Sequence, residues 1–319
     1  MVPTPPVRTR PALFLLGLCL GAFFAPAHPV FGRDGDGAAA SAPAPAYGAF
    51  RVCSLASGSG GNAYYAENED GAILIDAGIS LKRLRENLLR AGGRLEKVVA
   101  VLITHGHGDH VKAAGVWQRE YGAWRFLMTA EALREAQAKT SVRPPREPEF
   151  LEAGRDFEIG GFRVECLAVP HDAAGTVGFV LERAGRRCGV FTDVGAPFDG
   201  LGALLSTLDG LFIAGDYSDE ILDRRLACAM APPARGLLYQ TRRLRSGLGH
   251  LSNRQVGELL RDHAGDKLRG VVLTHLSADN NAPEQALAEV RALAGGKLDA
   301  SGAVLAAAPP KDPGPWLAF

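Results

Sequence analysis

The segment Thr104–His110 constrains this chain more than any other part of its sequence. It reads Thr-His-Gly-His-Gly-Asp-His and directly follows Val98–Ile103, an apolar run typical of a buried strand. Three imidazoles and one carboxylate therefore lie within six residues, and these donors suit Zn²⁺ or a similar divalent ion better than they suit packing. In an extended chain the side chains of His105 and His107 point the same way and can hold one ion together. Since four adjacent donors are difficult to fit around one tetrahedral ion, the segment predicts a site for two ions.

A simpler interpretation of this segment is a polar loop that caps a helix. Asp109 would then be the N-cap of a helix that runs from His110 to about Glu120. Capping accounts for only one of the four donors, so metal binding is the stronger interpretation.

Similar polar residues follow other strand-like runs along the chain. Three runs end this way: Phe162–Val169 before His171, Arg187–Thr192 before Asp193, and Gly270–Thr274 before His275. In α/β sheets, ligands gather beyond the carboxyl ends of strands. We therefore expect these three side chains to join the histidine cluster.

These motifs resemble those of metallo-β-lactamase-fold metallohydrolases, whose His-x-His-x-Asp-His pattern matches residues 105–110. The resemblance implies an α/β fold, the four-layer αβ/βα sandwich, and two divalent metal ions, with Zn²⁺ expected and Mn²⁺ or Fe as alternatives. It assigns His105, His107 and His171 to the first ion, Asp109, His110 and His275 to the second, and Asp193 to the bridging position.

The resemblance also implies a supporting role for Asp76, which follows the apolar run Ala72–Ile75. In this family the corresponding aspartate holds the histidine loop from behind the metal ligands. The alternative is an ordinary turn aspartate, because Asp-x-Gly, here ending at Gly78, is common turn chemistry.

A narrower resemblance concerns the YycJ/WalJ-like bacterial branch of the family, which is regarded as exonuclease-like. The segments that carry it are Cys53–Asn62, Gly249–Asn253 and Thr274–Asn281, and the likeness runs from about Phe50 to about Ala294. The first of these segments is rich in glycine and lacks the lysine of a nucleotide P-loop. Its backbone amides would suit a phosphate, and a tight turn accounts for the segment equally well. We expect its polar residues Ser57, Ser59 and Asn62 to line the site.

His250 and the residues after it predict a phosphate-binding site. Ser252–Gln255 has the pattern of a capping box, which would open a helix whose N-terminus favours phosphate. His250 would then bind the scissile phosphate or protonate the leaving oxygen, the alternative being a structural loop histidine. The run Arg242, Arg243 and Arg245 would track a nucleic-acid backbone or form a solvated basic face.

One stretch departs from the branch. Relatives usually carry a Glu-x-Asn-His-Asp-like sequence after the strand that follows Asp193, whereas Ala214–Ser218 reads Ala-Gly-Asp-Tyr-Ser. Since this loop is expected to border the cleft, Tyr217 would line the site. The change puts substrate choice, though not metal binding, in question.

Composition fits a globular enzyme of 319 residues, with 47% hydrophobic residues and strand–helix alternation that favours an α/β fold. Helices are expected over Leu81–Ala91, Ala130–Ala138 and Pro283–Leu293. The 35 basic residues balance 35 acidic ones, so any attraction of nucleic acid must be local. The five cysteines lack zinc-finger spacing.

The chain divides into three stretches. Residues 1–47 form a leader that is expected to be disordered; within it residues 1–27 have a signal-peptide pattern, and a start codon assigned too far upstream would also produce it. Residues 48–295 form the catalytic domain, and residues 296–319 read as a flexible tail rich in Ala, Pro and Gly. The resemblance implies a cytoplasmic protein without stable membrane association; export is the alternative if the signal pattern is used.

The function expected from the resemblance is that of a dinuclear-metal-dependent hydrolase, of phosphodiesterase or exonuclease type, using a metal-bound hydroxide. Its partners would be single-stranded or duplex nucleic-acid ends. Asp109 would orient the nucleophile and accept its proton, and His250 would face the phosphate or leaving group. Two alternatives stay open: a hydrolase of small esters, lactones or thioesters with the same fold, and a non-catalytic metal-binding protein, which the altered loop at 214–218 would suit.

Overall fold

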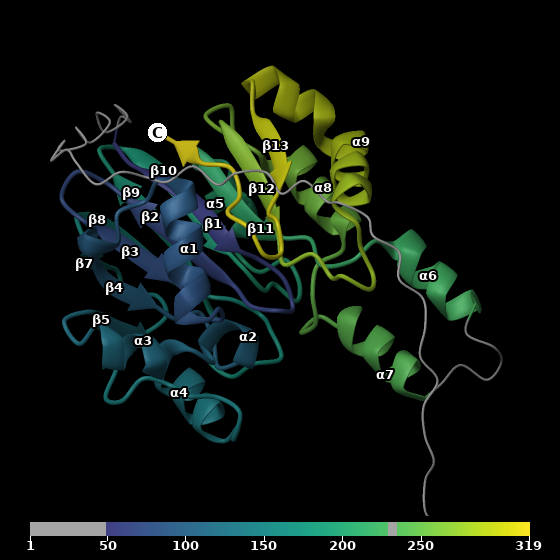
Figure 1. Ribbon diagram of the computed structural model, residues 1–319. Helices are drawn as coiled ribbons and strands as arrows, with labels where there is room; N and C mark the ends of the chain where they lie inside the picture. Colours follow the sequence, from purple (N-terminus) through teal and green to yellow (C-terminus); the bar gives the residue numbers. More distant parts are fainter. Residues whose placement is uncertain (1–48, 229–234) are drawn as a thin grey trace, which may run out of the picture. The chain divides into compact units, whose positions relative to one another are not determined.

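Two mixed β-sheets of seven strands each are stacked face to face and carry helices on their outer faces (Figure 1). The first sheet has the order β14-β1-β2-β3-β4-β5-β6, with β1 (Arg51–Ala56), β2 (Ala63–Glu67), β3 (Ala72–Ile75), β4 (Val98–Leu102), β5 (Arg125–Met128), β6 (Glu149–Phe150) and β14 (Leu317–Ala318). The second has the order β13-β12-β11-β10-β9-β8-β7, with β7 (Phe157–Ile159), β8 (Phe162–Ala168), β9 (Val177–Arg183), β10 (Arg186–Phe191), β11 (Gly210–Ala214), β12 (Gly270–Thr274) and β13 (Val304–Ala307). This computed structural model describes residues 49–228 and 235–319, and the predicted leader lies outside them.

Helices cover the outer face of each sheet. The first sheet carries α1 (Leu81–Ala91), α2 (Gly108–Val111), α3 (Ala114–Glu120) and α4 (Ala130–Gln137), and the second carries α5 (Leu201–Leu205), α8 (Asn253–His263) and α9 (Pro283–Ser301). One apolar cluster lies between the sheets and one lies under each helical layer. The predicted four-layer αβ/βα sandwich is therefore confirmed. Two further helices, α6 (Asp219–Cys228) and α7 (Arg235–Leu244), contact each other beside these layers.

Strand β4 shows why this sequence forms a sandwich. From Ala100 onward its side chains alternate, so that Ala100 and Leu102 join the cluster between the sheets, whereas Val101 joins the cluster under the helices. Because β4 is covered on both faces, the residues of the strand are all apolar. The strand ends in the interior, and the polar residues that follow it are held against the body of the protein.

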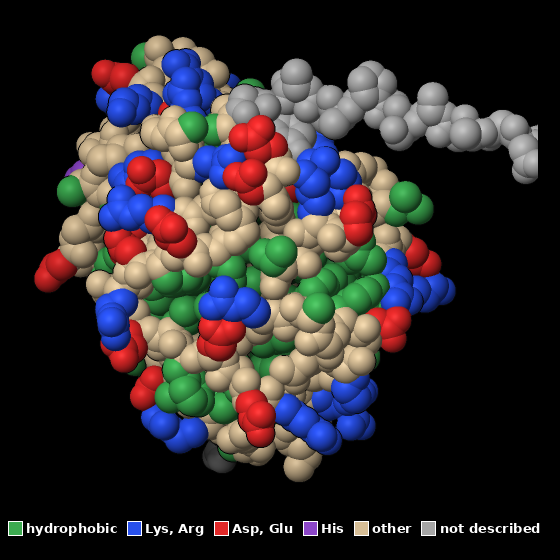
Figure 2. All heavy atoms as spheres, turned by 90° about the vertical axis from the view of Figure 1, so that its left-hand side faces the viewer, with side chains coloured by type: hydrophobic (Ala, Val, Ile, Leu, Met, Phe, Trp, Pro, Cys, Tyr) green, Lys and Arg blue, Asp and Glu red, His purple; other side chains and the backbone are tan. Residues whose placement is uncertain are grey.

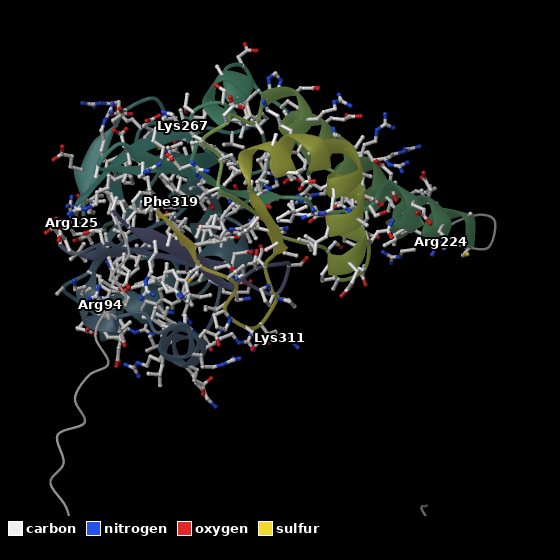
Figure 3. The ribbon with its side chains drawn as sticks, turned by 90° about the horizontal axis from the view of Figure 1, so that it is seen from above. Arg94, Arg125, Arg224, Lys267, Lys311 and Phe319 are labelled. Atoms are coloured by element: carbon white, nitrogen blue, oxygen red, sulfur yellow. The ribbon has the colours of Figure 1, made fainter. Side chains whose placement is uncertain are left out.

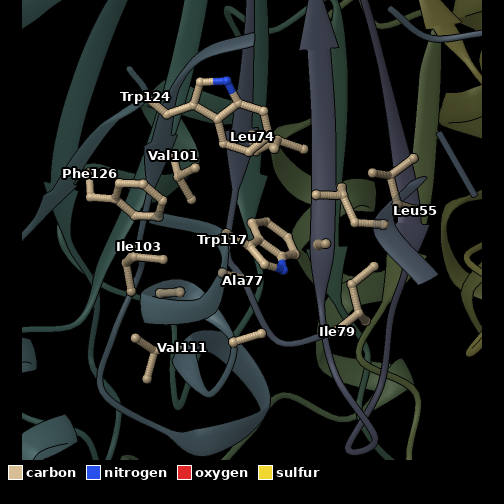
Figure 4. Packing of buried hydrophobic residues seen from close by; sticks show 14 of the residues in the cluster. Leu55, Leu74, Ala77, Ile79, Val101, Ile103, Val111, Trp117, Trp124 and Phe126 are labelled. Carbon is tan, nitrogen blue, oxygen red and sulfur yellow. The ribbon is translucent and has the colours of Figure 1, made fainter. Parts of the chain in front are cut away.

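Trp117 on α3 is fully buried within the cluster between the first sheet and its helices (Figure 4). Ile103, just after β4, and Val111, at the end of α2, belong to the same cluster. The segment Thr104–His110 lies between these two anchors. Burial of each such aliphatic side chain stabilises by about 1.5–3 kcal/mol, so both ends of the histidine-rich segment are fixed by packing.

The helix predicted from His110 to about Glu120 is two helices, α2 and α3. The N-cap of α2 is His107, so the interpretation of Asp109 as the N-cap is wrong. At the break, the N–H of Ala113 donates to the carbonyl of Ala77, 3.0 Å away, rather than to its own helix. The side chain of Asp109 is thus not used for capping.

Residues 296–319 are not a flexible tail, contrary to the prediction. Helix α9 continues to Ser301, β13 pairs with β12, and β14 pairs with β1. The indole N–H of Trp316 donates to the carbonyl of Ala91 at 2.9 Å, and Figure 3 shows Phe319 beside the sheets. Composition could not predict these contacts, because the partners lie far away in the sequence. The partner of Trp316, for example, lies 225 residues earlier. Among the described residues, the compact unit accordingly extends to the last residue.

Figure 2 shows the face of the molecule on the side of β7 and β8, where apolar side chains gather between charged ones. Phe150 of β6 and Val99 of β4 are exposed, and Arg125 of β5 pairs with Glu149 of β6. Within residues 49–228 and 235–319, no cluster of metal-binding side chains includes residues of this face. Among the described helices, none combines the length and apolarity that a membrane span requires.

Candidate metal centre

Polar side chains meet where the inner strands of both sheets end. The residues that follow these strands are Asp76 after β3, His105 after β4, His171 after β8, Asp193 after β10, Asp216 after β11 and His275 after β12. The fold places the carboxyl ends of these strands together, which is where α/β proteins bind their ligands.

The first group of donors consists of His105, His107, His171 and Asp193, whose ligand atoms lie within 4.8 Å of one another. Nδ1 of His107 is 3.3 Å from Nε2 of His171. Nε2 of His105 is 3.2 Å from Oδ2 of Asp193. Three imidazoles and one carboxylate at these separations suit the tetrahedral N/O coordination that Zn²⁺ prefers.

The second group consists of Asp109, His110 and His275, again with ligand atoms within 4.8 Å of one another. Oδ2 of Asp109 is 3.2 Å from Nε2 of His275 and 3.5 Å from Nε2 of His110. Nε2 of His110 is also 3.1 Å from Oδ2 of Asp193, the oxygen that faces the first group. One carboxylate oxygen thus lies between the two groups, in the place expected for a bridging ligand.

The outward-facing ring nitrogen of four histidines in the cluster meets a fixed partner. These pairs are His105 Nδ1 with Thr104 Oγ1 (3.0 Å), His110 Nδ1 with Asp76 Oδ2 (2.7 Å), His171 Nδ1 with the carbonyl of Gly249 (3.0 Å), and His275 Nδ1 with Asp216 Oδ2 (3.0 Å). Such contacts fix the orientation of a metal-binding imidazole and raise its basicity. Each of these rings therefore has one nitrogen held and the other turned towards the centre.

Several buried atoms at the centre lack a hydrogen-bond partner. They include Nε2 of His105 and both carboxylate oxygens of Asp193, a residue that is only 2% exposed. Buried polar atoms are almost always paired, and an unpaired buried charge is costly. These atoms belong to the first donor group, and Oδ2 of Asp193 also faces His110 of the second group. Divalent cations would satisfy them, and the residues present fit two ions.

The charges of the centre also favour a cation. Desolvation raises the pKa of Asp193, but the neighbouring His275 and His110 outweigh it and hold that pKa well below its usual value. Desolvation lowers the pKa of His110, but Asp76, Asp109 and Asp193 hold it well above the usual value. Positive charge therefore stabilises the buried carboxylates, and protonated histidines supply this charge when no ion is bound.

The histidines of the first group behave differently. Desolvation is the largest cause that lowers the pKa of each of His105, His107 and His171 to about 4. These imidazoles are therefore neutral at pH 7, and a neutral imidazole is the form that binds a metal ion.

Asp76 supports the histidine loop and also occupies a turn. Its carboxylate accepts hydrogen bonds from the backbone N–H and the hydroxyl of Thr104, at 2.9 and 2.8 Å, in addition to its contact with His110. Its φ of 64° lies in the left-handed region, as does that of His275 at 53°. Non-glycine residues in this region cluster at functional sites, where surrounding contacts hold them in place.

The glycine-rich loop after β1 contacts the second group. The hydroxyl of Ser57 accepts a hydrogen bond from the N–H of His275 at 2.9 Å. Nδ2 of Asn62 is 3.0 Å from Nε2 of His110, and Oδ1 of Asn62 accepts from the N–H of Gly58 at 2.8 Å. Ser59 is exposed and lines the cavity in front of the centre. The three residues expected to line the site thus all lie at it.

Tyr217 does not line the site, contrary to the prediction. It is 4% exposed and packs with Leu222 of α6 and Leu244 of α7. The strand-like bridge between Tyr217 and Ser252 turns its neighbour Asp216 towards the centre instead. The altered loop therefore contributes a carboxylate to the site and an aromatic ring to the packing of α6 and α7.

A cavity of about 310 Å³ opens onto the centre. His250 lines it, with Nδ1 3.4 Å from Oδ1 of Asp193, and its ring stacks on that of His275 at 5.3 Å. The capping box predicted at Ser252 and Gln255 is confirmed at the start of α8. His250 is thus a residue of the cavity, next to a helix N-terminus that favours anions.

Gly249 allows His250 to reach this position. A Cβ at residue 249 would lie 1.9 Å from the carbonyl oxygen of Arg243, so only glycine fits where this loop crosses the end of α7. Of the three arginines of the basic run, Arg243 lines the cavity and bonds to Asp172, Arg245 bonds to Asp223, and Arg242 is exposed.

Asp216 is a residue of the centre that the sequence analysis did not identify as a site residue. It is 2% exposed, lines the cavity and contacts His275, and its Oδ1 has no partner. The signal was present, because Asp216 follows the apolar strand β11 in the same way as Asp193 follows β10.

Replacing Asp216 by alanine should weaken binding of the second ion by about 10–100-fold, because loss of the partner of a ligating imidazole has this effect. Asp216→Asn keeps an acceptor oxygen and should lie between the wild type and Asp216→Ala. Metal titration of the apo protein measures both. Asp223→Ala, on the exposed surface of α6, is the control, and equal affinities in all four proteins would contradict the role of Asp216.

The stacked sheets and the His-x-His-x-Asp-His segment after β4 define the metallo-β-lactamase fold class. Residues 72–276 match the family described as the beta-lactamase superfamily domain, and the chain therefore belongs to that superfamily. A solved structure of YhfI from Bacillus subtilis, itself described as a metallo-β-lactamase fold protein, has a TM-score of 0.60 at 14% identity, over 83% of this chain and 99% of that one. At this identity the likeness shows the fold alone.

Comparison with individual relatives shows which members of the superfamily this chain resembles. The chain is 31% identical over 242 residues to the exodeoxyribonuclease WalJ of Streptococcus pneumoniae serotype 2, covering 74% of this chain and 85% of that protein. It is 28% identical over 233 residues to the exodeoxyribonuclease YycJ of Bacillus anthracis, covering 73% and 84%. The predicted resemblance to the YycJ/WalJ-like branch is confirmed.

Proposed function

We propose that this protein is a phosphodiesterase of the exonuclease type that works with two divalent ions, Zn²⁺ first among them. The observation that supports this most is the position of Oδ2 of Asp193, which lies within 3.2 Å of a ligand nitrogen in each donor group. Ions held by the two groups would supply Lewis acidity, a lowered pKa for water and positive charge beside a phosphate. The relatives named exodeoxyribonuclease make a phosphodiester of DNA the first substrate to test.

Asp109 is suited to orient the attacking water. Its carboxylate is partly accessible and faces His110 and His275. Desolvation raises the pKa of Asp109, but His110 and His275 outweigh it and lower that pKa well below its usual value. An ionised carboxylate accepts a hydrogen bond from water, and its low pKa favours orienting the water over retaining the proton.

His250 is suited to act on the phosphate or on the leaving group. Its Nδ1 lies 3.4 Å from Asp193, which leaves Nε2 for the substrate. A histidine held in this way can bind a phosphate oxygen or give a proton to the leaving oxygen. Arg243, on the wall of the same cavity, adds positive charge for the phosphate.

The test is a panel of substrates offered to the metal-loaded protein: 5′- and 3′-labelled oligonucleotides, bis(p-nitrophenyl) phosphate, a lactone and a thioester. We expect stepwise shortening of the oligonucleotides and hydrolysis of the model phosphodiester, both lost in His105→Ala. Hydrolysis of the lactone or thioester without cleavage of any phosphodiester would contradict the proposal. A metal-loaded protein inactive on every substrate would point to a non-catalytic role.

A further inference from the structure

The rim of the cavity on the side of α7 concentrates exposed apolar side chains. Across the two described ranges, seven large hydrophobic side chains are exposed, and three of them, Leu238, Tyr239 and Leu248, fall within one stretch of eleven residues. The same stretch supplies Gln240 and Arg243 to the cavity wall. Apolar surface gathered beside a binding cavity marks a contact surface. In Figure 1, α7 lies beside the sandwich and is not covered by the helical layers.

Tyr239 extends the wall of the cavity outward. It is 71% exposed and precedes Arg243 by four residues on α7, so the two side chains lie on one side of the helix, one turn apart. One turn is about 5.4 Å, compared with about 3.4 Å per nucleotide in a stacked strand. A strand with a phosphate beside Arg243 would therefore bring a base, one or two nucleotides away, to the level of the phenol ring.

The charges of this rim suit a polyanion. Arg243 bonds to Asp172 through Nε and Nη2, which leaves Nη1 for a phosphate oxygen. Arg242 is exposed on the same helix, and α7 contains no acidic residue. The chain as a whole carries no net charge, so this helix provides attraction that the composition does not.

We propose that α7 is the binding site for a single-stranded DNA end, with a base stacked on Tyr239 and a neighbouring phosphate at Arg243. Proteins that hold single strands without reading their sequence combine cationic side chains with aromatic rings, because every base has a face that can stack. Inside a duplex, each base beyond the terminal pair has both faces covered by its neighbours and cannot turn out onto a ring. The protein should therefore prefer single-stranded or frayed ends to blunt duplexes. The inference rests on the proposed function and deepens it.

The experiment compares the wild type, Tyr239→Ala and Tyr239→Trp, with Leu89→Ala, an equally exposed apolar residue on α1, as the control. The measured quantity is the ratio of kcat/KM for a labelled single-stranded DNA oligonucleotide to kcat/KM for bis(p-nitrophenyl) phosphate, using the full, metal-loaded chain. Tyr239→Ala should lower this ratio by about tenfold, mainly through KM, because stacking is lost. Tyr239→Trp should keep the ratio at the wild-type value or above, and Leu89→Ala should leave it unchanged.

Three results would overturn the proposal. The first is an unchanged ratio in Tyr239→Ala. The second is a stronger effect of Tyr239→Ala on an RNA oligonucleotide than on DNA. The third is a change from dimer to monomer in Tyr239→Ala, measured by light scattering, which would assign the surface to a contact between copies of the chain. If the wild type cleaves neither substrate, the proposed function fails, and fluorescence anisotropy of single-stranded DNA with the same variants still tests the surface.

Discussion

Replacing Asp109 by alanine should lower kcat/KM for bis(p-nitrophenyl) phosphate by about 10³-fold. The substitution removes two functions of the carboxylate: it belongs to the second donor group, and it is the group best placed to orient the attacking water. Loss of a positioned acid–base group alone costs about 10²–10⁴-fold. Steady-state kinetics at saturating Zn²⁺ and elemental analysis of the same protein after dialysis measure the two effects, and we expect the metal content to fall by one ion.

Asp266→Ala provides the matched control, because the side chain of Asp266 is 98% exposed and pairs with Lys297 on the surface. That variant should keep the wild-type rate and both ions. An Asp109→Ala protein with the full rate would refute the two-ion hydrolase. A protein that loses the rate but keeps both ions would instead show that Asp109 acts on the water and contributes little to metal affinity.

The metal centre could be predicted from the sequence to an unusual degree, because most of its donors directly follow apolar runs. A run such as Val98–Ile103 identifies a buried strand without knowledge of its neighbours. The residue after a buried strand must lie at the edge of the sheet where that strand ends. His105, Asp193 and His275 could therefore be assigned to one edge of the fold before their distances were known. The pairing of individual atoms, such as Oδ2 of Asp193 with both groups, required the structure.

The features that escaped prediction depend on contacts between distant parts of the chain. The ordered C-terminus is an example, since β14 is a two-residue strand that exists only because β1 offers it an edge. Asp216 and Tyr217 are another, because the bridge to Ser252 decides which of the two side chains faces the metal centre. Local composition carries no information about either pairing. The break between α2 and α3 likewise follows from a hydrogen bond to Ala77.

Removing the metal ions should lower the thermal stability of the protein strongly. Without ions, the buried carboxylate of Asp193 is balanced by protonated His110 and His275, and several buried atoms stay unpaired. A ligand at about 1,000 times its Kd stabilises the folded state by about 4 kcal/mol, which for a domain of this size corresponds to a Tm shift of about 10 °C. Thermal unfolding with Zn²⁺, with EDTA, and with Zn²⁺ restored measures the shift. His105→Ala is the control, since its Tm should respond much less to EDTA. A wild-type Tm that stays constant while elemental analysis shows the ions leaving would mean that the centre is held by the protein's own contacts and does not depend on bound cations.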